Sequence, residues 1–476
     1  MLFNSFEFIF IFLPVSFFVY FYLNHKRLTI ASRAWLVFSS LFFYGWWNIA
    51  YLPLILVSIL FNYTITNTMA EYDENKKNYF SKRSLLKIAL VFNIGFLGYF
   101  KYMDFFIENI NMVFDSDIGL LYLALPLAIS FFTLQQIAFV VDSYEGLVKE
   151  KSFLDYTVFV TFFPQLIAGP IVHHKEMMPQ FANIRNKVKR YKNKSLGLLI
   201  FSIGLFKKVV IADTFAIWAS YGFDSATTLN VFEAWATSLS YAFQLYFDFS
   251  GYTDMAIGAA LLFNIKIPIN FNSPYKALSI IDFWQRWHIS LSNFIGTYVY
   301  TPIIRSFNKL NFHKAMFATI LTFIIVGLWH GASWMFVIFG TLHGIALTIN
   351  HYWKRTKFKI NNVIAWFITF NFVNLTMVIF RAKEWDDVEK VLSGMLGMNG
   401  ISSIKTLIEF GPIDKFSLMN IIMVFLIAFV GFFMGNSTSI TYQAMQNKIK
   451  YIYISALLLI STLHLNRVSE FIYFNF

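Results

Sequence analysis

The sequence predicts an all-α integral membrane protein with about eleven or twelve transmembrane helices plus re-entrant or interfacial ones. The 476-residue chain is 57% hydrophobic and only 13% charged, whereas a soluble domain carries about 25% charged residues. Many apolar runs approach the roughly 20 residues that a helix needs to cross a bilayer. Basic residues recur in alternate loops, as expected of the cytoplasmic loops of a polytopic protein.

Composition limits the chemistry that the chain can perform. There is no Cys, which excludes disulfides, thiolate metal sites and a Cys-acyl intermediate within this chain. The net charge is +12, and we attribute it to loops that face anionic membrane lipid, not to nucleic-acid binding. The N-terminal apolar run lacks a basic region before it and a small-residue cleavage site after it. We therefore expect a retained helix and not a signal peptide.

The first five predicted spans agree with one orientation. They are 3–23, 28–47, 49–69, one that ends near Tyr102, and 120–141. Loops 24–33 and 71–87 are basic, which places them in the cytoplasm. The loop after Tyr102 carries four acidic residues and no Lys or Arg, which suits the outer face.

The middle of the chain departs from simple alternation. Segment 153–172 is apolar, contains two prolines, and has basic residues on both flanks, so we expect it to be re-entrant or interfacial. The next span, 195–220, carries Lys207 and Lys208, which we expect to snorkel or to face a wet cavity. Segment 231–263 is too long for one span, and we expect a break near Gly251.

The remaining elements complete one polytopic domain. The long connection 264–314 contains apolar and polar residues at helical spacing near 281–292, as in an interfacial helix. Predicted spans at 315–329, 334–352, 363–380, 418–434 and 452–463 follow. We expect one domain, 1–476, built from N-terminal helices 1–142, a catalytic core 153–352 and C-terminal helices 362–476. No transporter-type internal repeat is visible.

The polar residue that most needs an explanation is His330, in the apolar stretch 323–344. A His at membrane depth is costly and is a functional-site hypothesis by default. The alternative is a structural His that bonds across a helix interface. Because no Walker loop, dinucleotide fingerprint, HExxH motif or Gly-x-Ser-x-Gly elbow is present, chemistry would depend on this His. An imidazole that titrates near neutral pH suits removal of a hydroxyl proton toward an activated acyl donor such as a thioester.

Other polar residues cluster around predicted membrane depth. Gln244 and Asp248 are four residues apart and share a helix face, with Asp254 beyond them. Asp282 and Arg286 have the spacing of a local ion pair, which could be purely structural. His288, beside two tryptophans, could be an interfacial anchor or a cavity residue.

Two further histidine positions receive structural interpretations. On one straight helix His343 would lie about 20 Å from His330, so the two could share a metal only if the chain turned at 331–333. The doublet His173-His174 lies near a basic patch, and we expect structural or surface placement. We expect no metal site.

Five longer motifs stand out along the chain: Phe163-Pro-Gln-Leu-Ile-Ala-Gly-Pro-Ile171, Gln244-Leu-Tyr-Phe-Asp-Phe-Ser-Gly-Tyr-Thr-Asp-Met255, Asn270-Phe-Asn-Ser-Pro-Tyr275, Asp282-Phe-Trp-Gln-Arg-Trp-His-Ile-Ser-Leu291 and Leu328-Trp-His-Gly331. With these motifs the sequence resembles the membrane-bound O-acyltransferase family, in its bacterial branch that modifies alginate and peptidoglycan. The resemblance implies that His330 is catalytic and that His288 is a second polar site residue. It also implies a ring of helices around a central tunnel, with Gln244, Asp248, Asp254, Asp282, Arg286 and Trp329 as tunnel-lining or donor-binding candidates.

The resemblance also implies a reaction and a setting. The donor would be cytoplasmic acetyl-CoA, with no metal, and the enzyme would lie in the bacterial inner membrane. An extracytoplasmic partner resembling an SGNH esterase would pass acetyl groups to a polysaccharide, with peptidoglycan preferred over alginate or another exopolysaccharide. Relatives carry a glycine pair after the His288 helix where this chain has Ile304-Arg305, which suggests a different acceptor or partner.

Two functions of other classes stay open at this stage. In a transporter of a lipid-linked glycan or acyl group, Lys207, Lys208 and the intramembrane aspartates would line the path. A non-catalytic scaffold would bind a thioester without turnover.

Overall fold

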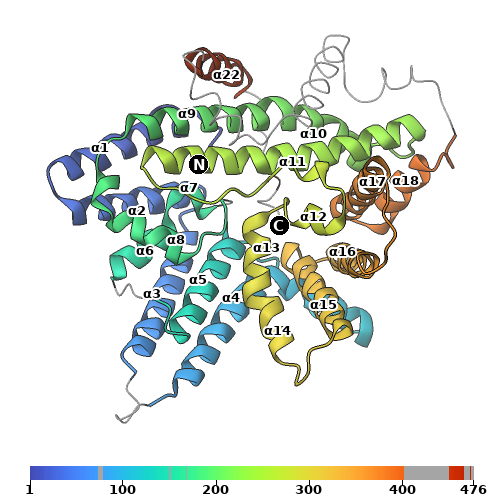
Figure 1. Ribbon diagram of the computed structural model, residues 1–476, viewed down its shortest axis with the longest axis horizontal. Coiled ribbons are helices and arrows are strands. Elements are labelled where there is room, and N and C mark those ends of the chain that lie inside the picture. The colour runs from blue at the N-terminus through green and yellow to red at the C-terminus, as the bar shows by residue number, and fades with distance from the viewer. Residues whose placement is uncertain (73–78, 149–151, 168, 401–449, 466–471, 473–476) are drawn as a thin grey trace. The chain divides into compact units, whose positions relative to one another are not determined.

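The structure is a computed structural model that describes residues 1–72, 79–148, 152–167, 169–400, 450–465 and 472 (Figure 1). Every regular element within these ranges is a helix, which confirms the predicted all-α class. The chain divides into two compact units. One comprises Met1–Phe201 and Met255–Pro268, and the other comprises Ser202–Asp254 and Ile269–Phe476. The expected single domain with three groups of helices stays a prediction.

The first unit contains the N-terminal helices. They are η1 (Glu7–Phe12), α1 (Leu13–His25), α2 (Thr29–Gly45), α3 (Tyr51–Ala70), α4 (Lys82–Phe114), α5 (Ile129–Tyr144), α6 (Phe153–Thr161), α7 (Phe163–Leu166), α8 (His174–Ala182) and η2 (Ile184–Lys187). Helix α9 (Tyr191–Phe206) begins in this unit and ends in the other.

The second unit carries the predicted site residues. Its elements are η3 (Lys207–Ala212), α10 (Asp213–Ser220), η4 (Tyr221–Ser225), most of α11 (Val231–Leu262), η5 (Pro274–Lys276), α12 (Ile280–Trp284), α13 (Ile289–Ile295), η6 (Gly296–Tyr300), α14 (Thr301–Arg305), α15 (Phe312–His330), α16 (Trp334–Trp353), α17 (Asn362–Arg381), α18 (Trp385–Met395) and α22 (Lys450–His464).

Seven helical runs in the described part of the chain are long and apolar enough to cross a membrane. They are Glu7–His25, Tyr51–Ala70, Lys82–Phe114, Tyr191–Ser225, Phe312–His330, Trp334–Trp353 and Asn362–Arg381. Helices α2 and α5, with 17 and 16 residues, are shorter. The predicted span 418–434 lies outside the described residues. The membrane class is therefore confirmed, and the larger span count stays a prediction.

Two predicted boundaries are wrong. The predicted span 120–141 becomes helical only at Ile129, because Pro126 disfavours helical backbone in the residue before it. The expected break at Gly251 does not occur, since α11 runs unbroken for 32 residues. Gly251 instead allows a close approach, because a Cβ there would lie 2.7 Å from the carbonyl oxygen of Gly204.

The segment expected to be re-entrant forms two short helices. Helix α6 has nine residues and α7 has four. At 1.5 Å per residue neither can cross a hydrocarbon core of about 30 Å. This agrees with a re-entrant or interfacial segment.

Helices α15 and α16 form a tightly packed hairpin. A Cβ at Gly327 would lie 2.2 Å from the Phe336 carbonyl oxygen, and one at Gly340 would lie 2.2 Å from the Phe323 carbonyl oxygen. Such distances require glycine, because in membranes small residues let helix backbones approach closely. The hairpin therefore holds its two helices in one register.

Gly340→Ala is expected to destabilise the folded protein by roughly 1–3 kcal/mol, the range for overpacking a filled interior. Thermal unfolding in detergent, followed by size-exclusion chromatography, measures the change. Gly98→Ala is the matched control, because nothing lies within 4 Å of a Cβ at that position in α4. If both substitutions changed the unfolding temperature equally, the close packing of the helices at Gly340 would not contribute to the stability of the hairpin.

Candidate active site

His330 lies where the α15–α16 hairpin turns. It is the last residue of α15, and Gly331 after it is extended. Ser333 then caps α16, with its hydroxyl accepting a hydrogen bond from the Met335 N–H at 3.2 Å. The helix break places the imidazole at a helix end.

Aromatic rings enclose the His330 side chain, and the residue is only 3% exposed. The ring centroids of Trp329 and Phe380 each lie 5.1 Å from that of His330, and that of Phe339 lies 6.2 Å away. An apolar wall of this kind lowers the local dielectric, so charges that develop beside the imidazole interact more strongly than in water.

His288 occupies a strained backbone position. It precedes α13 with φ 44° and ψ 54°, in the left-handed region. Non-glycine residues are uncommon there, and such strain concentrates at functional sites. The residue is fully buried. Its ring Nδ1 lies 3.1 Å from the side-chain oxygen of Asn270.

Asn270 determines which nitrogen of His288 carries the proton. Its Oδ1 accepts from the backbone N–H of Ser290 at 3.1 Å and from the Ser290 hydroxyl at 2.9 Å. Because a backbone N–H can only donate, this atom is the amide oxygen, and His288 Nδ1 must donate to it. Burial lowers the pKa of His288 to about 3. The imidazole is therefore neutral at physiological pH, with its lone pair on Nε2.

Trp329 brings the two histidines to one place. Its ring centroid lies 6.3 Å from that of His288 and 5.1 Å from that of His330. The two histidines come from segments 42 residues apart in sequence, yet both contact a single indole. Three predicted site residues, His288, His330 and Trp329, therefore form one cluster.

Asn270→Asp is expected to add a second protonation to the acidic limb of the pH–rate profile, which a general-base His330 already gives the wild type. A buried carboxylate beside His288 favours the imidazolium and raises the pKa of His288 from about 3 toward neutrality. If His288 acts in its neutral form, the rate of the variant falls more steeply with decreasing pH than that of the wild type, because two site imidazoles must then both be neutral.

The matched control is Asn272→Asp, because Asn272 is exposed two residues along the same segment. It should keep the wild-type pH profile. A profile for Asn270→Asp that overlaid the wild type would show that neutral His288 takes no part in the rate-determining step.

His343 lies on α16, and the chain turns at Gly331–Ser333, which is the condition under which a metal shared with His330 stayed open. The Nδ1 of His343 accepts a hydrogen bond from the Trp284 indole N–H at 3.1 Å. Its Nε2 must then carry the proton and donate to the Thr376 hydroxyl, 3.0 Å away. Both ring nitrogens are engaged by neighbouring helices, which matches a His that bonds across a helix interface.

The buried lysines of η3 pair with aspartates of α10 and α11. Lys208 lies 2.7 Å from Asp248 and 2.8 Å from Asp213, and Lys207 lies 2.7 Å from Asp254. The expectation that the lysines snorkel or face a wet cavity is wrong, because each finds a carboxylate inside the unit. Asp248 also accepts from the backbone N–H of Ile472 at 3.0 Å. These ion pairs brace the helices that carry them.

The other candidates occupy more open positions. Gln244 is half-buried on α11. Asp282 and Arg286 form the expected i,i+4 ion pair at 2.6 Å, and Arg286 also donates to the Asn272 carbonyl oxygen at 3.3 Å. Both side chains of the pair are about 30% exposed, which agrees with a brace for the interfacial segment.

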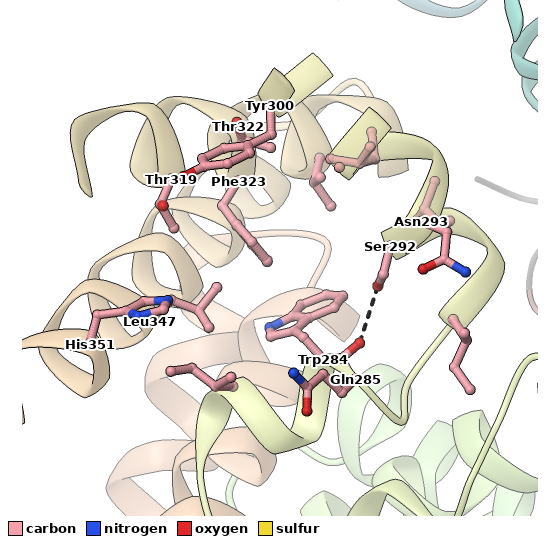
Figure 2. A pocket seen from close by; sticks show the side chains of 16 residues that line it. Trp284, Gln285, Ser292, Asn293, Tyr300, Thr319, Thr322, Phe323, Leu347 and His351 are labelled. Carbon is pink, nitrogen blue, oxygen red and sulfur yellow. Dashed lines mark hydrogen bonds between the residues drawn. The ribbon is translucent and has the colours of Figure 1, made fainter. Parts of the chain in front are cut away.

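A cavity of about 550 Å³ lies along the hairpin, lined by residues of α12, α13, η6, α15 and α16 (Figure 2). Its wall on α15 includes Thr319, Thr322 and Val326. This face continues one turn further to His330, because residues three or four apart share a helix face. The volume falls within the 300–1,000 Å³ of small-molecule sites. A mainly apolar chamber thus borders the face of α15 that carries His330.

Sequence reasoning missed Asn270 and Ser290 as site residues. Both lie within motifs that carried the family resemblance, and that is the signal that could have found them. Their contribution depends on the side-chain oxygen of Asn270, which accepts hydrogen bonds from His288 and from two groups of Ser290. Spacing along the sequence does not reveal such a contact.

The comparisons with known proteins identify the family. The model of the membrane-bound O-acyltransferase family matches residues 41–382. The chain belongs to this family. It is 51% identical over 432 residues to a Helicobacter pylori protein named peptidoglycan O-acetyltransferase, with 84% of this chain and 81% of that protein covered.

Two other groups of family members are more distant relatives. A Pseudomonas aeruginosa protein named probable alginate O-acetylase AlgI is 35% identical over 390 residues, covering 81% of this chain and 72% of its own length. A Streptococcus thermophilus protein named teichoic acid D-alanyltransferase is 28% identical over 287 residues, which cover 53% of this chain and 68% of that protein. This family member is therefore a membrane enzyme that transfers an acyl group from an acyl donor.

Proposed function

We propose that this enzyme moves an acetyl group from cytoplasmic acetyl-CoA to a hydroxyl group, for O-acetylation of peptidoglycan outside a bacterial inner membrane. The observation that carries the proposal is the cluster of His330, His288 and Trp329. The chamber of about 550 Å³ supports it, because Ile289, next to His288 in sequence, and Val326, one turn before His330 on α15, line that chamber. The 51% identity to a protein named peptidoglycan O-acetyltransferase favours that acceptor. Alginate or another exopolysaccharide is the second candidate acceptor, because the chain is 35% identical to a protein named probable alginate O-acetylase AlgI.

His330 acts as the general base in this mechanism. It removes the proton from the acceptor hydroxyl as the oxygen attacks the thioester carbonyl, and the thiolate of CoA leaves. His288 stays neutral and accepts a hydrogen bond through Nε2, which orients the acceptor or a relay group. Because the chain has no Cys, direct transfer needs the fewest steps. An extracytoplasmic partner resembling an SGNH esterase receives the acetyl group and passes it to the polysaccharide.

The test uses the full chain reconstituted in vesicles with acetyl-labelled acetyl-CoA inside. Soluble peptidoglycan fragments, or alginate oligomers, are supplied outside together with the candidate partner. We expect CoA release that depends on the acceptor, and label on peptidoglycan fragments. Label on alginate alone would reassign the acceptor. CoA retention under all conditions, with tight thioester binding, would instead support a scaffold.

A further inference from the structure

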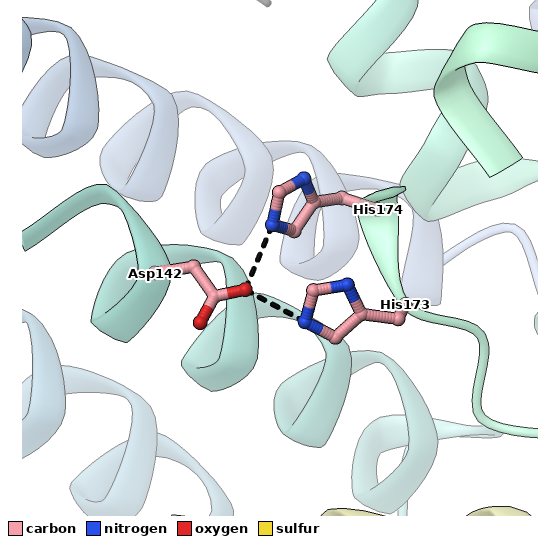
Figure 3. A group of neighbouring side chains, drawn as sticks. All are labelled: Asp142, His173 and His174. Carbon is pink, nitrogen blue, oxygen red and sulfur yellow. Dashed lines mark hydrogen bonds and ion pairs between the residues drawn. The ribbon is translucent and has the colours of Figure 1, made fainter. Parts of the chain in front are cut away.

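Asp142, His173 and His174 converge in the first unit (Figure 3). The residues assigned to acyl transfer belong to the second unit. Asp142 lies in the last turn of α5, His173 precedes α8, and His174 begins it. The Nε2 atoms of the two histidines lie 2.7 and 2.8 Å from the same carboxylate oxygen, Oδ2 of Asp142. All the candidate ligand atoms lie within 4.8 Å of one another.

Of the two placements expected for the histidine doublet, structural or surface, the arrangement matches the structural one. The side chains of His174 and Asp142 are each only 4% exposed, and that of His173 is 29% exposed. Consecutive side chains ordinarily point in different directions, but here both rings turn toward one oxygen, with centroids 4.5 Å apart. The edge of Phe139 closes one side, 5.4 Å from the ring of His174.

The donor set identifies the kind of ion that would fit. Two imidazole nitrogens and one carboxylate oxygen are ligands typical of zinc and other divalent transition metals. Calcium and magnesium prefer oxygen ligands throughout. Three protein ligands leave one tetrahedral position open, and the partly exposed edge of His173 lets water or another small ligand fill it.

Metal binding requires small local changes. Bonds of about 2.0–2.1 Å to zinc place tetrahedral ligands about 3.3 Å apart, so each Nε2 must move from Asp142 Oδ2 by roughly half an ångström. The protons on Nε2 move to Nδ1. At His173 this breaks the weak cap in which Nδ1 accepts from the Lys175 N–H at 3.3 Å. Without an ion, the same atoms form a hydrogen-bonded triad.

We propose that Asp142, His173 and His174 form a zinc-type transition-metal site that fastens the end of α5 to the start of α8. The ion holds the two segments together, and water fills the open fourth position. The ion clamps the segment that follows the predicted re-entrant stretch 153–172, and it takes no part in acyl transfer. The proposal differs from the sequence-based expectation that the protein has no metal site.

The test measures zinc in the full chain, purified through a tag that contains no histidine. Elemental analysis is expected to give one zinc per chain after equilibration with zinc and desalting. Chelator treatment should lower the unfolding temperature, and zinc should restore it. Cobalt substitution should produce the visible absorption of a tetrahedral site.

Asp142→Asn and His174→Gln should each abolish stoichiometric zinc, and the control His25→Gln should retain it, because His25 is exposed at the end of α1. The wild type alone can overturn the proposal, so the test does not depend on whether a variant folds. It would do so if it bound much less than one zinc per chain, or if chelator left its unfolding temperature unchanged. Full zinc binding by both triad variants would also overturn it.

Discussion

His330→Ala is expected to abolish acetyl transfer while the protein remains folded. Loss of a positioned general base lowers a rate by typically 10²–10⁴-fold. Alanine is the best helix former, so the last turn of α15 should persist. The measurement is CoA release under saturating donor, with monodispersity in detergent as the test of folding.

The matched control is His343→Ala, which removes a buried imidazole from the same hairpin. It leaves the donor of Trp284 and the hydroxyl of Thr376 without their partner, and each unsatisfied buried group costs about 1–3 kcal/mol. We expect a less stable protein whose folded fraction still turns over. Wild-type turnover by His330→Ala would mean that the catalytic assignment is wrong.

Lys208→Met is expected to cause the largest loss of stability. The ammonium lies 2.7 Å from Asp248 and 2.8 Å from Asp213, and both carboxylates are at least nine-tenths buried. Breaking a buried ion pair by removing one partner costs about 3–5 kcal/mol, because the charge that remains is uncompensated. Thermal or denaturant unfolding in detergent measures the change, and poor yield of folded protein is an expected symptom.

Two further variants isolate the buried charge as the cause. Lys309→Met removes an exposed lysine and should have little effect. Adding Asp248→Asn and Asp213→Asn to Lys208→Met removes all three charges and should restore much of the lost stability. A triple variant no more stable than Lys208→Met would show that packing, and not charge, sets the effect.

The sequence predicted the site in part. His330 was identifiable because a single His in an apolar stretch is costly, and that cost depends only on the residue and its neighbours along the chain. His288 was identified as a site residue because it lies in a motif that resembles the family. The contact of both with Trp329, and the role of Asn270 in fixing the proton of His288, depend on segments that meet only after folding.

The sequence by itself determined the membrane class, most of the helical spans and the acyltransferase family. Hydropathy and motifs are properties of consecutive residues, so they can be read without a fold. Only the tertiary structure decided that Lys207 and Lys208 pair with buried aspartates, that His343 is structural, and that His173 and His174 meet Asp142. Each of these depends on which faces of separate helices pack together, and helical periodicity identifies a face without identifying its partner.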